Sequence, residues 1–254
     1  MSKQIVFFGS SEFSLPVLEK ILNAQGLSLC AIITTPDKPA GRHLKLTPNP
    51  VKVLAQKNNI LILEPNHYHL EPDVVGLVAA YGKIIPQEIL DKFNGQIYNI
   101  HPSLLPKYRG PSPLQQQILD GITETGVTII QLDALMDHGP VVAITHDIIS
   151  PDDTTETLGN RLFEKGADLF IDQYSVLSTQ KKEQDHSQAT YTKKLTRQDG
   201  FLPWEEFNKL ITNSTQNRHA PRLFRAFFPW PGVWSIDPHG QRRKLVSLSP
   251  LLIR

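Results

Sequence analysis

The 254-residue sequence contains one cysteine, Cys30, so no disulfide can form within the chain. Cys30 lies among apolar residues, and we expect it to fill the core rather than to react. No run of about 18 apolar residues is present, which argues against a membrane-spanning helix. The N-terminus lacks a basic stretch followed by an apolar one, so we expect no signal peptide and a cytoplasmic protein.

Two common site signatures are also missing. The first glycine turn, Gly9-Ser10-Ser11, does not have the G-x-G-x-x-G spacing of a dinucleotide fingerprint, so we do not predict NAD binding. His67 and His69 have a spacing that a strand could offer to a metal ion, but no Cys, Asp or Glu set completes it. We therefore predict no metal site.

The composition is that of an ordinary globular protein, but the charge is unevenly distributed. Hydrophobic residues make up 40% of the chain and charged residues 20%, which allows a sizeable core. Residues 1–180 hold 13 Lys and Arg against 19 Asp and Glu, whereas residues 181–254 hold 13 against 6. This asymmetry suggests that the second part faces a polyanion, although a solvated basic tail explains the charge equally well.

The order of apolar runs and amphipathic stretches predicts the fold class. A strand at residues 4–8, a helix at 13–22 and a strand at 29–33 form a βαβ unit, which is typical of a parallel sheet. Further strands are predicted at residues 60–63, 73–80, 96–98, 126–132 and 141–149, and helices at 50–58, 87–93, 113–120 and 154–177. We predict an α/β fold with a Rossmann-like, mostly parallel sheet flanked by helices.

Two segments are predicted to lack regular structure. Residues 34–50 hold four prolines and the basic side chains Lys38, Arg42 and Lys45, which favours a long irregular loop of functional importance. Residues 178–200 are polar and without clear periodicity, which indicates a linker or a wrapped connection. We therefore divide the chain into a first domain at 1–180, a linker at 181–200 and a second domain at 201–254. In the second, strands at 233–236 and 244–248 are expected to pair across a turn.

The segment from Asn99 to Pro106, N-I-H-P-S-L-L-P, is the strongest candidate for a site. In an extended backbone Asn99 and His101 project from one face, at the carboxyl end of a strand where open α/β sheets hold ligands. Asp137, just before Gly139-Pro140, is a third candidate. Without further context, the favoured interpretations are a polar turn with a satisfied histidine for the pair and a turn-capping aspartate for Asp137.

Several stretches in collinear order resemble the formyltransferase family, and in particular its branch that acts on methionyl-tRNA. The N-x-H…D set and the S-L-L-P turn match the wider family, whereas the loop at residues 36–48 and the P-W-P-G sequence at 229–232 match the tRNA branch. Other matching stretches lie at residues 8–10, 80–82, 109–110, 126–128, 137–140, 191–196, 199–200 and 225–227.

The resemblance implies transfer of a formyl group from the co-substrate 10-formyltetrahydrofolate to the free α-amine of initiator methionyl-tRNA. It assigns the catalytic roles to Asn99, His101 and Asp137. Asn99 would donate an amide N–H to the formyl oxygen as that oxygen gains negative charge. His101 would stabilise the same oxygen or pass a proton, and Asp137 would orient the imidazole.

The resemblance also implies the binding residues. It places folate against Ser103, Leu104, Leu105, Pro106, Lys83, Ile84 and Ile85, for which ordinary packing is the alternative interpretation. It places the acceptor end of tRNA against Lys38, Arg42 and Lys45, for which a solvated loop is the alternative. Arg42 is the expected discriminating residue, because a guanidinium can bind a phosphate or a base edge through two hydrogen bonds.

The sequence departs from the family pattern in its second domain. The family completes a C-terminal barrel resembling an OB-fold, whereas we expect this chain to contain two of its strands, forming a small partial β-barrel, and an insertion at residues 213–221. Two other functions stay open: formyl transfer to another amine, such as an amino sugar nucleotide or glycinamide ribonucleotide, and a non-catalytic RNA-binding role. The first would need Asn99, His101 and Asp137 but not the basic loop. We expect a monomer.

Overall fold

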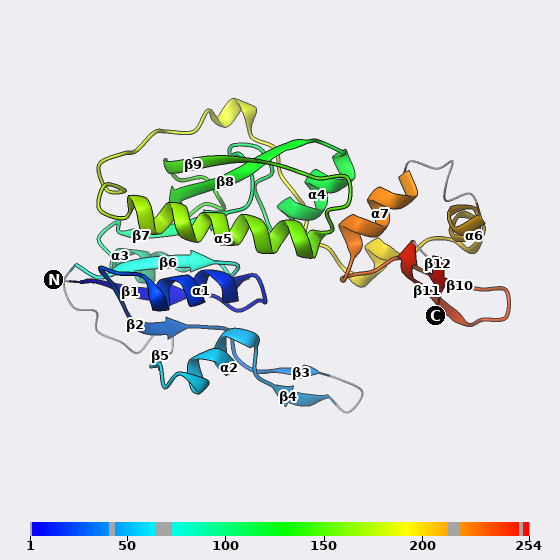
Figure 1. Cartoon of the computed structure of the whole chain (residues 1–254), viewed down its shortest axis with the longest axis horizontal. Coiled ribbons are helices and arrows are strands. Elements are labelled where there is room, and N and C mark those ends of the chain that lie inside the picture. The colour runs from blue at the N-terminus through cyan, green and yellow to red at the C-terminus, as the bar shows by residue number, and fades with distance from the viewer. Residues whose placement is uncertain (1, 41–43, 64–72, 213–218, 249–250, 254) are drawn as a thin grey trace.

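The structure, a computed structural model, describes residues 2–40, 44–63, 73–212, 219–248 and 251–253. Its centre is a seven-stranded sheet with the strand order β5-β2-β1-β6-β7-β8-β9 (Figure 1). The first five strands of that order are parallel, and β8 and β9 are antiparallel to their neighbours. The predicted α/β fold with a mostly parallel sheet is confirmed. The strands are β1 Lys3–Phe8, β2 Leu27–Ile33, β5 Ile62–Leu63, β6 Val75–Ala79, β7 Ile97–His101, β8 Glu124–Gln131 and β9 Val141–Ile148.

The burial of the strands explains their order in the sheet. β6 is buried along its whole length, as expected for a central parallel strand covered on both faces. β9 instead alternates between covered and exposed residues, which suits an outer strand with one face toward water. The hydrophobic runs therefore lie in the middle of the sheet and the alternating run lies at its edge.

Helices cover the two faces of the sheet unequally. One core cluster packs α1 (Ser14–Asn23), α2 (Pro50–Lys57), α4 (Pro113–Asp120) and α5 (Thr155–Gln173) against one face. A second, smaller cluster packs α3 (Gln87–Asp91) and the residues that follow it against the other face. Because α3 has only five residues, this second face is the less covered one, and it is the face that carries the candidate site.

The structure corrects three of the predicted boundaries. Residues 34–50 are not wholly irregular, because β3 (Lys38–Ala40) and β4 (Lys45–Thr47) pair as an antiparallel hairpin. Proline at position 39 is compatible with this pairing because both strands of a two-stranded sheet are edges. The strand predicted at 96–98 continues to His101, and the helix predicted to reach residue 177 ends at Gln173.

The predicted connection at residues 178–200 is wrapped onto the first part of the chain. Lys182 pairs with Val141 at the start of β9, and Tyr191 forms a bridge with Arg109. Two short 3₁₀ turns, His186–Gln188 and Arg197–Gly200, interrupt the segment. These contacts bring residues 184–192 close to the carboxyl end of β7.

The C-terminal part contains a small antiparallel sheet, as predicted. β10 (Trp234–Ile236) pairs with β11 (Arg242–Leu248) across the expected turn, and β12 (Leu251–Ile253) adds a third strand where two were expected. Two helices, α6 (Trp204–Thr212) and α7 (His219–Phe227), were not predicted. Residues 213–218 of the expected insertion lie outside the described residues.

Helix α7 joins the C-terminal part to the sheet domain, as Figure 1 shows. The Thr155 hydroxyl, at the start of α5, donates to the carbonyl of Ala226, and Arg225 donates to the carbonyl of Asp153. The larger core cluster contains buried residues of both parts, so the two parts share one core. Among the described helices, none is both long and apolar enough to span a bilayer.

Candidate functional site

Strand β7 presents Ile97, Asn99 and His101 on one face of the sheet, because successive side chains of a strand alternate. This is the face that α3 covers, since Ile97 packs in the smaller core cluster. His101 lies opposite Thr128 of β8 in the antiparallel register. Asn99 and His101 are therefore held by a sheet with neighbours on both sides, which fixes their backbone positions.

The turn after β7 is fixed by buried hydrogen bonds. The Thr128 hydroxyl donates to the carbonyl of Ser103 at 2.7 Å and accepts from the amide of Leu105 at 3.1 Å. The Ser103 hydroxyl donates to the carbonyl of Lys107 at 2.7 Å, which closes the turn. Leu104 packs over Gly126, where a Cβ atom would lie only 2.5 Å from the leucine side chain. The turn is therefore rigid at its base.

The protonation pattern of His101 follows from its partner. Its Nε2 lies 3.0 Å from the carbonyl oxygen of Tyr108. Because a carbonyl oxygen can only accept, we assign a proton to Nε2, and in the neutral imidazole Nδ1 then carries the lone pair. The side chain is only 4% exposed. His101 is thus oriented by a backbone group, with Nδ1 free to accept a proton.

Asp137 lies on the Nδ1 side of His101. Its Oδ1 is 3.5 Å from His101 Nδ1 and 3.4 Å from the side-chain amide nitrogen of Asn99, which donates to it. Its Oδ2 accepts from the amide of Gly110 at 2.7 Å. The structure therefore brings together the three residues predicted to be catalytic, from positions 99, 101 and 137.

The loop that carries Asp137 has an unusual backbone. Asp137 has φ 50°, in the left-handed region where a residue with a side chain is strained by about 1–3 kcal/mol. Two residues later, a Cβ atom on Gly139 would lie 1.9 Å from the carbonyl oxygen of Gln131, so only glycine fits. This close approach folds the loop back over the sheet and places the carboxylate beside His101.

This arrangement suits a reaction in which an oxygen gains negative charge and a proton moves. Asn99 supplies an amide donor, and His101 supplies a nitrogen that can take up or release a proton. Asp137 would stabilise the doubly protonated imidazole by its negative charge.

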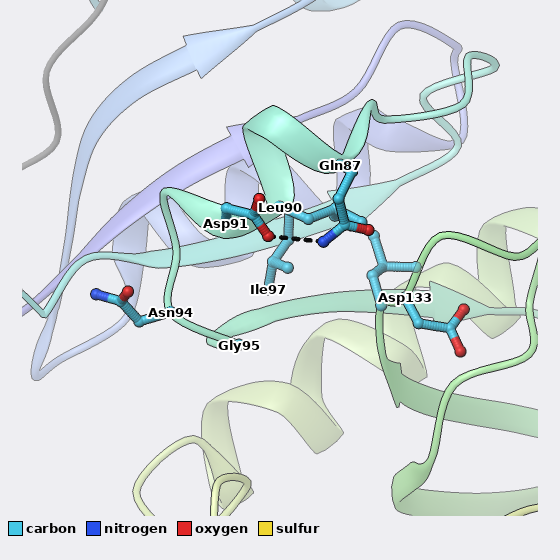
Figure 2. Close-up of a pocket in the computed structure, with 8 residues that line it drawn as sticks. Gln87, Leu90, Asp91, Asn94, Gly95, Ile97 and Asp133 are labelled. Carbon is cyan, nitrogen blue, oxygen red and sulfur yellow. Dashed lines mark hydrogen bonds between the residues drawn. The ribbon is translucent and has the colours of Figure 1, made fainter.

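A cavity of about 420 Å³ opens on the same face of the sheet, at the Ile97 end of β7 (Figure 2). Leu90, Ile97 and Leu132 are its apolar lining residues, and Asn94 and Asp133 are among its polar ones. The remaining lining residues are Gln87, Asp91 and Gly95. The lining therefore mixes apolar side chains with hydrogen-bonding groups, which suits a flat heterocycle whose edge carries hydrogen-bonding groups.

The residues predicted to contact folate have mixed environments. Lys83 and Ile84 are exposed, the latter by 72%, whereas Ile85 is buried in the smaller core cluster. Of the turn, Ser103 and Leu105 are buried and Leu104 and Pro106 are half-buried. The turn covers the His101 end of the sheet face, and the cavity lies at the other end. The folate contacts of these seven residues stay a prediction.

Two of the three basic residues predicted to bind tRNA, Lys38 and Lys45, lie on the β3–β4 hairpin. Lys38 pairs with Thr47 and Lys45 with residue 40, so this register puts both lysines on one face of the hairpin, and both are exposed. Asn49 anchors the base of the hairpin, since its side chain accepts from the amide of Lys52 and donates to the carbonyl of Thr35. Arg42 lies outside the described residues.

Sequence reasoning missed two parts of this region. The cavity residues Leu90, Ile97 and Leu132 read as ordinary core positions, and only Ile97, two residues before Asn99, carried a signal of proximity. Residues 184–192 were taken as part of the linker, yet they lie beside the segment 108–110. His67 and His69 lie outside the described residues. Within the described ranges, the structure brings together no set of three potential metal-ligating side chains.

Comparisons with known sequences point to one family. The sequence profile described as "Formyl transferase" matches residues 3–174 of this chain. The chain is 38% identical over 244 residues to a methionyl-tRNA formyltransferase of Dehalococcoides mccartyi, covering 91% of this chain and 75% of that protein. It is 39% identical over 245 residues to a methionyl-tRNA formyltransferase of Chloroflexus aurantiacus, covering 91% and 76%.

Solved structures with the same fold are more distant in sequence. An N-formyltransferase of Helicobacter canadensis, in complex with folinic acid and dTDP-3-aminofucose, has a TM-score of 0.67 and 18% identity, covering 96% of this chain and 86% of that chain. A 4-N formyltransferase from Francisella tularensis has a TM-score of 0.71 and 16% identity, covering 96% and 97%. At these identities the likeness establishes the fold alone.

Proposed function

Because this chain belongs to the formyl transferase family, we propose that it transfers the formyl group of 10-formyltetrahydrofolate to the α-amine of initiator methionyl-tRNA. The observation that carries the proposal is the grouping of Asn99, His101 and Asp137 on one sheet face. The choice of acceptor is supported by relatives at 38–39% identity that are named methionyl-tRNA formyltransferases.

The chemistry assigned to the three side chains follows from their atoms. When bound, 10-formyltetrahydrofolate supplies an activated formyl group on nitrogen. Asn99 donates its side-chain N–H to the oxygen that gains negative charge, and loss of such a donor typically costs about 10²–10³ in rate. His101 takes the proton released by the attacking amine at Nδ1, because Nε2 is held by the Tyr108 carbonyl. It would return this proton to the folate nitrogen as the bond between that nitrogen and the formyl carbon breaks, which leaves tetrahydrofolate and the formylated amine as products.

Asp137 acts on His101 rather than on the substrate. Its carboxylate is 3.5 Å from Nδ1, so it stabilises the imidazolium that forms when His101 takes up the proton. The Gly110 amide holds the second carboxylate oxygen and prevents the side chain from turning away. The result is a proton acceptor whose charged form is compensated locally.

The cavity at Ile97 is the site we propose for the pterin ring of the folate. It lies two residues before Asn99 on the same face of β7, and its lining combines apolar side chains with the polar groups of Asn94 and Asp133. The exposed Lys83 and Ile84, and the turn from Ser103 to Pro106, are proposed to contact the rest of the molecule.

The hairpin supports a nucleic-acid acceptor. Lys38 and Lys45 share one exposed face of it, where they can meet successive phosphates of an acceptor stem. We propose that Arg42, at the end of the hairpin in the sequence, contributes to the same contact. The excess of Lys and Arg in residues 201–254 would add non-specific attraction in a second, tRNA-binding domain.

The proposal is tested by comparing acceptors with the purified protein and 10-formyltetrahydrofolate. We expect formylation of charged initiator tRNA, with no comparable transfer to an amino sugar nucleotide or to glycinamide ribonucleotide. Preference for one of the small acceptors would mean that this acceptor, and not the tRNA, is the substrate, and the roles assigned to the three side chains would be retained. Transfer to none of them, with folate bound, would favour a non-catalytic RNA-binding role.

A further inference from the structure

Arg109 is a buried cation surrounded by neutral partners. It is only 1% exposed, and it is the largest of the fully buried side chains in the described residues. Its guanidinium donates to Gln184 Oε1 at 2.7 and 3.2 Å, to His186 Nδ1 at 2.8 Å and to the Tyr191 hydroxyl at 3.2 Å. Burying a charge without an opposite charge is costly, so these hydrogen bonds must hold the guanidinium in place.

Gln184 connects Arg109 to the loop of Asp137. Its Nε2 donates to the carbonyl oxygens of Asp137 at 3.0 Å and of Gly139 at 2.7 Å. Because a guanidinium can only donate and carbonyls can only accept, the orientation of the Gln184 amide is determined. The side chain is 6% exposed, so water does not readily replace these bonds.

The residues on either side of Arg109 contact the other catalytic groups. The Tyr108 carbonyl accepts from His101 Nε2, and the Gly110 amide donates to the Asp137 carboxylate. The backbone of this segment is itself held, because the Arg109 amide donates to the carbonyl of Thr190 and its carbonyl accepts from the amide of Thr192. Segment 108–110 therefore fixes His101 and Asp137 together.

We propose that Arg109 and Gln184 are positioning residues for formyl transfer, which hold the Asp137 carboxylate and the His101 imidazole in a fixed position relative to each other. Arg109 anchors the segment 108–110, and Gln184 ties that segment to the backbone of the Asp137 loop. Neither side chain touches the reacting atoms. This inference rests on the proposed function, because formyl transfer is the reaction for which Arg109 and Gln184 would position the two side chains.

The substitution Gln184→Glu separates the two halves of this network. A glutamate can still accept from Arg109, and even gains an ion pair, but it cannot donate to the carbonyls of Asp137 and Gly139 and repels them. We expect kcat to fall at least about tenfold, since small displacements of catalytic groups cost up to about 10² in rate. The KM for the formyl donor should change less than about threefold, because folate binding does not use these bonds.

Two further variants control this test. Gln188→Glu adds the same charge to an exposed residue of the same segment and should keep the wild-type kcat. Gln184→Met is uncharged, fills a similar volume and also lacks the donor, so its kcat should fall in the same direction as that of Gln184→Glu. A kcat for Gln184→Glu equal to that of Gln188→Glu would overturn the proposal.

A spectroscopic measurement keeps the proposal independent of the acceptor. The ¹⁵N chemical shift of the His101 imidazole, assigned by its loss in His101→Gln, reports the protonation and hydrogen bonding of Nδ1. We expect it to change in Gln184→Glu and Gln184→Met but not in Gln188→Glu. If kcat and thermal stability both fall while the His101 signal stays unchanged, the role of Gln184 is purely structural and the positioning role is refuted. An inactive wild type would refute the proposed function, whereas the His101 signal would still decide this inference.

Discussion

Thr128→Val removes one buried hydroxyl from strand β8 while keeping the shape of the side chain. Thr128 is fully buried, and its hydroxyl holds both the carbonyl of Ser103 and the amide of Leu105. Valine leaves these two backbone groups without that partner, at about 1–3 kcal/mol each, so the free energy of unfolding should fall by about 2–6 kcal/mol. For a chain of this size, 1 kcal/mol shifts the thermal midpoint by about 2–4 °C, so we expect a decrease of about 4–24 °C.

The assay is thermal unfolding followed by circular dichroism, with Thr145→Val as the control. Thr145 lies on the outer strand β9 and is half-exposed, so its replacement should change stability by no more than about 0.5 kcal/mol. Formyl transfer by Thr128→Val should also fall, because Thr128 lies opposite His101 and anchors the turn that follows it. A midpoint equal to that of Thr145→Val would refute the claim that this hydroxyl fixes the turn.

Three further variants test the site, the hairpin and the acid stability. Asp137→Asn should lower kcat by about 10²–10⁴. The thermal midpoint should change little, because the amide oxygen of asparagine can still accept the hydrogen bond from the Gly110 amide. A rate near that of the wild type would remove Asp137 from the mechanism. Replacing Lys38 and Lys45 with alanine should raise the KM for tRNA. A salt titration should show that the slope of the logarithm of the binding constant against the logarithm of the salt concentration falls in magnitude by up to about 0.9 per lost phosphate contact. An unchanged KM would argue against the hairpin as a tRNA contact. Burial raises the pKa of Asp153, but the hydrogen bonds from Arg161, Ser150 and Thr157 and the charge of Arg161 together outweigh it, so the net pKa is lowered. This group therefore stabilises the fold above about pH 4, and the stabilisation is lost as the pH falls further. Asp153→Asn should show a smaller loss of thermal midpoint than the wild type below about pH 4, and equal losses would contradict the assignment.

The central part of the fold could be predicted because its signals are local. Buried strands such as β1 and β6 are continuous apolar runs, and α5 begins directly after its N-cap Thr154, whose side chain caps the helix in a reciprocal pair with Thr157. The end of β7 could not be placed in the same way. The strand was predicted to end at residue 98, but pairing of His101 with Thr128 of β8 extends it to His101. That partner is distant in the sequence, and periodicity carries no information about it.

The candidate site could be predicted in part for the same reason. Asn99 and His101 are two residues apart, so their common face follows from strand geometry alone. Asp137 needed the resemblance to a family, because its place beside His101 depends on a backbone fold that Gly139 permits. Gln184 carried no signal at all, since its role comes from a hydrogen bond to Arg109, 75 positions earlier in the chain.

The most direct test of the account measures single-turnover formyl transfer to initiator methionyl-tRNA by the wild type and by Asn99→Ala. Asn99 is half-buried in β7, and its side-chain amide is the donor assigned to the oxygen that gains negative charge. We predict formylmethionyl-tRNA as the product of the wild type and a rate at least about a hundredfold lower for the variant. An Asn99→Ala variant as fast as the wild type would contradict the role assigned to Asn99. A wild type that leaves the methionyl amine unmodified would contradict the proposed acceptor.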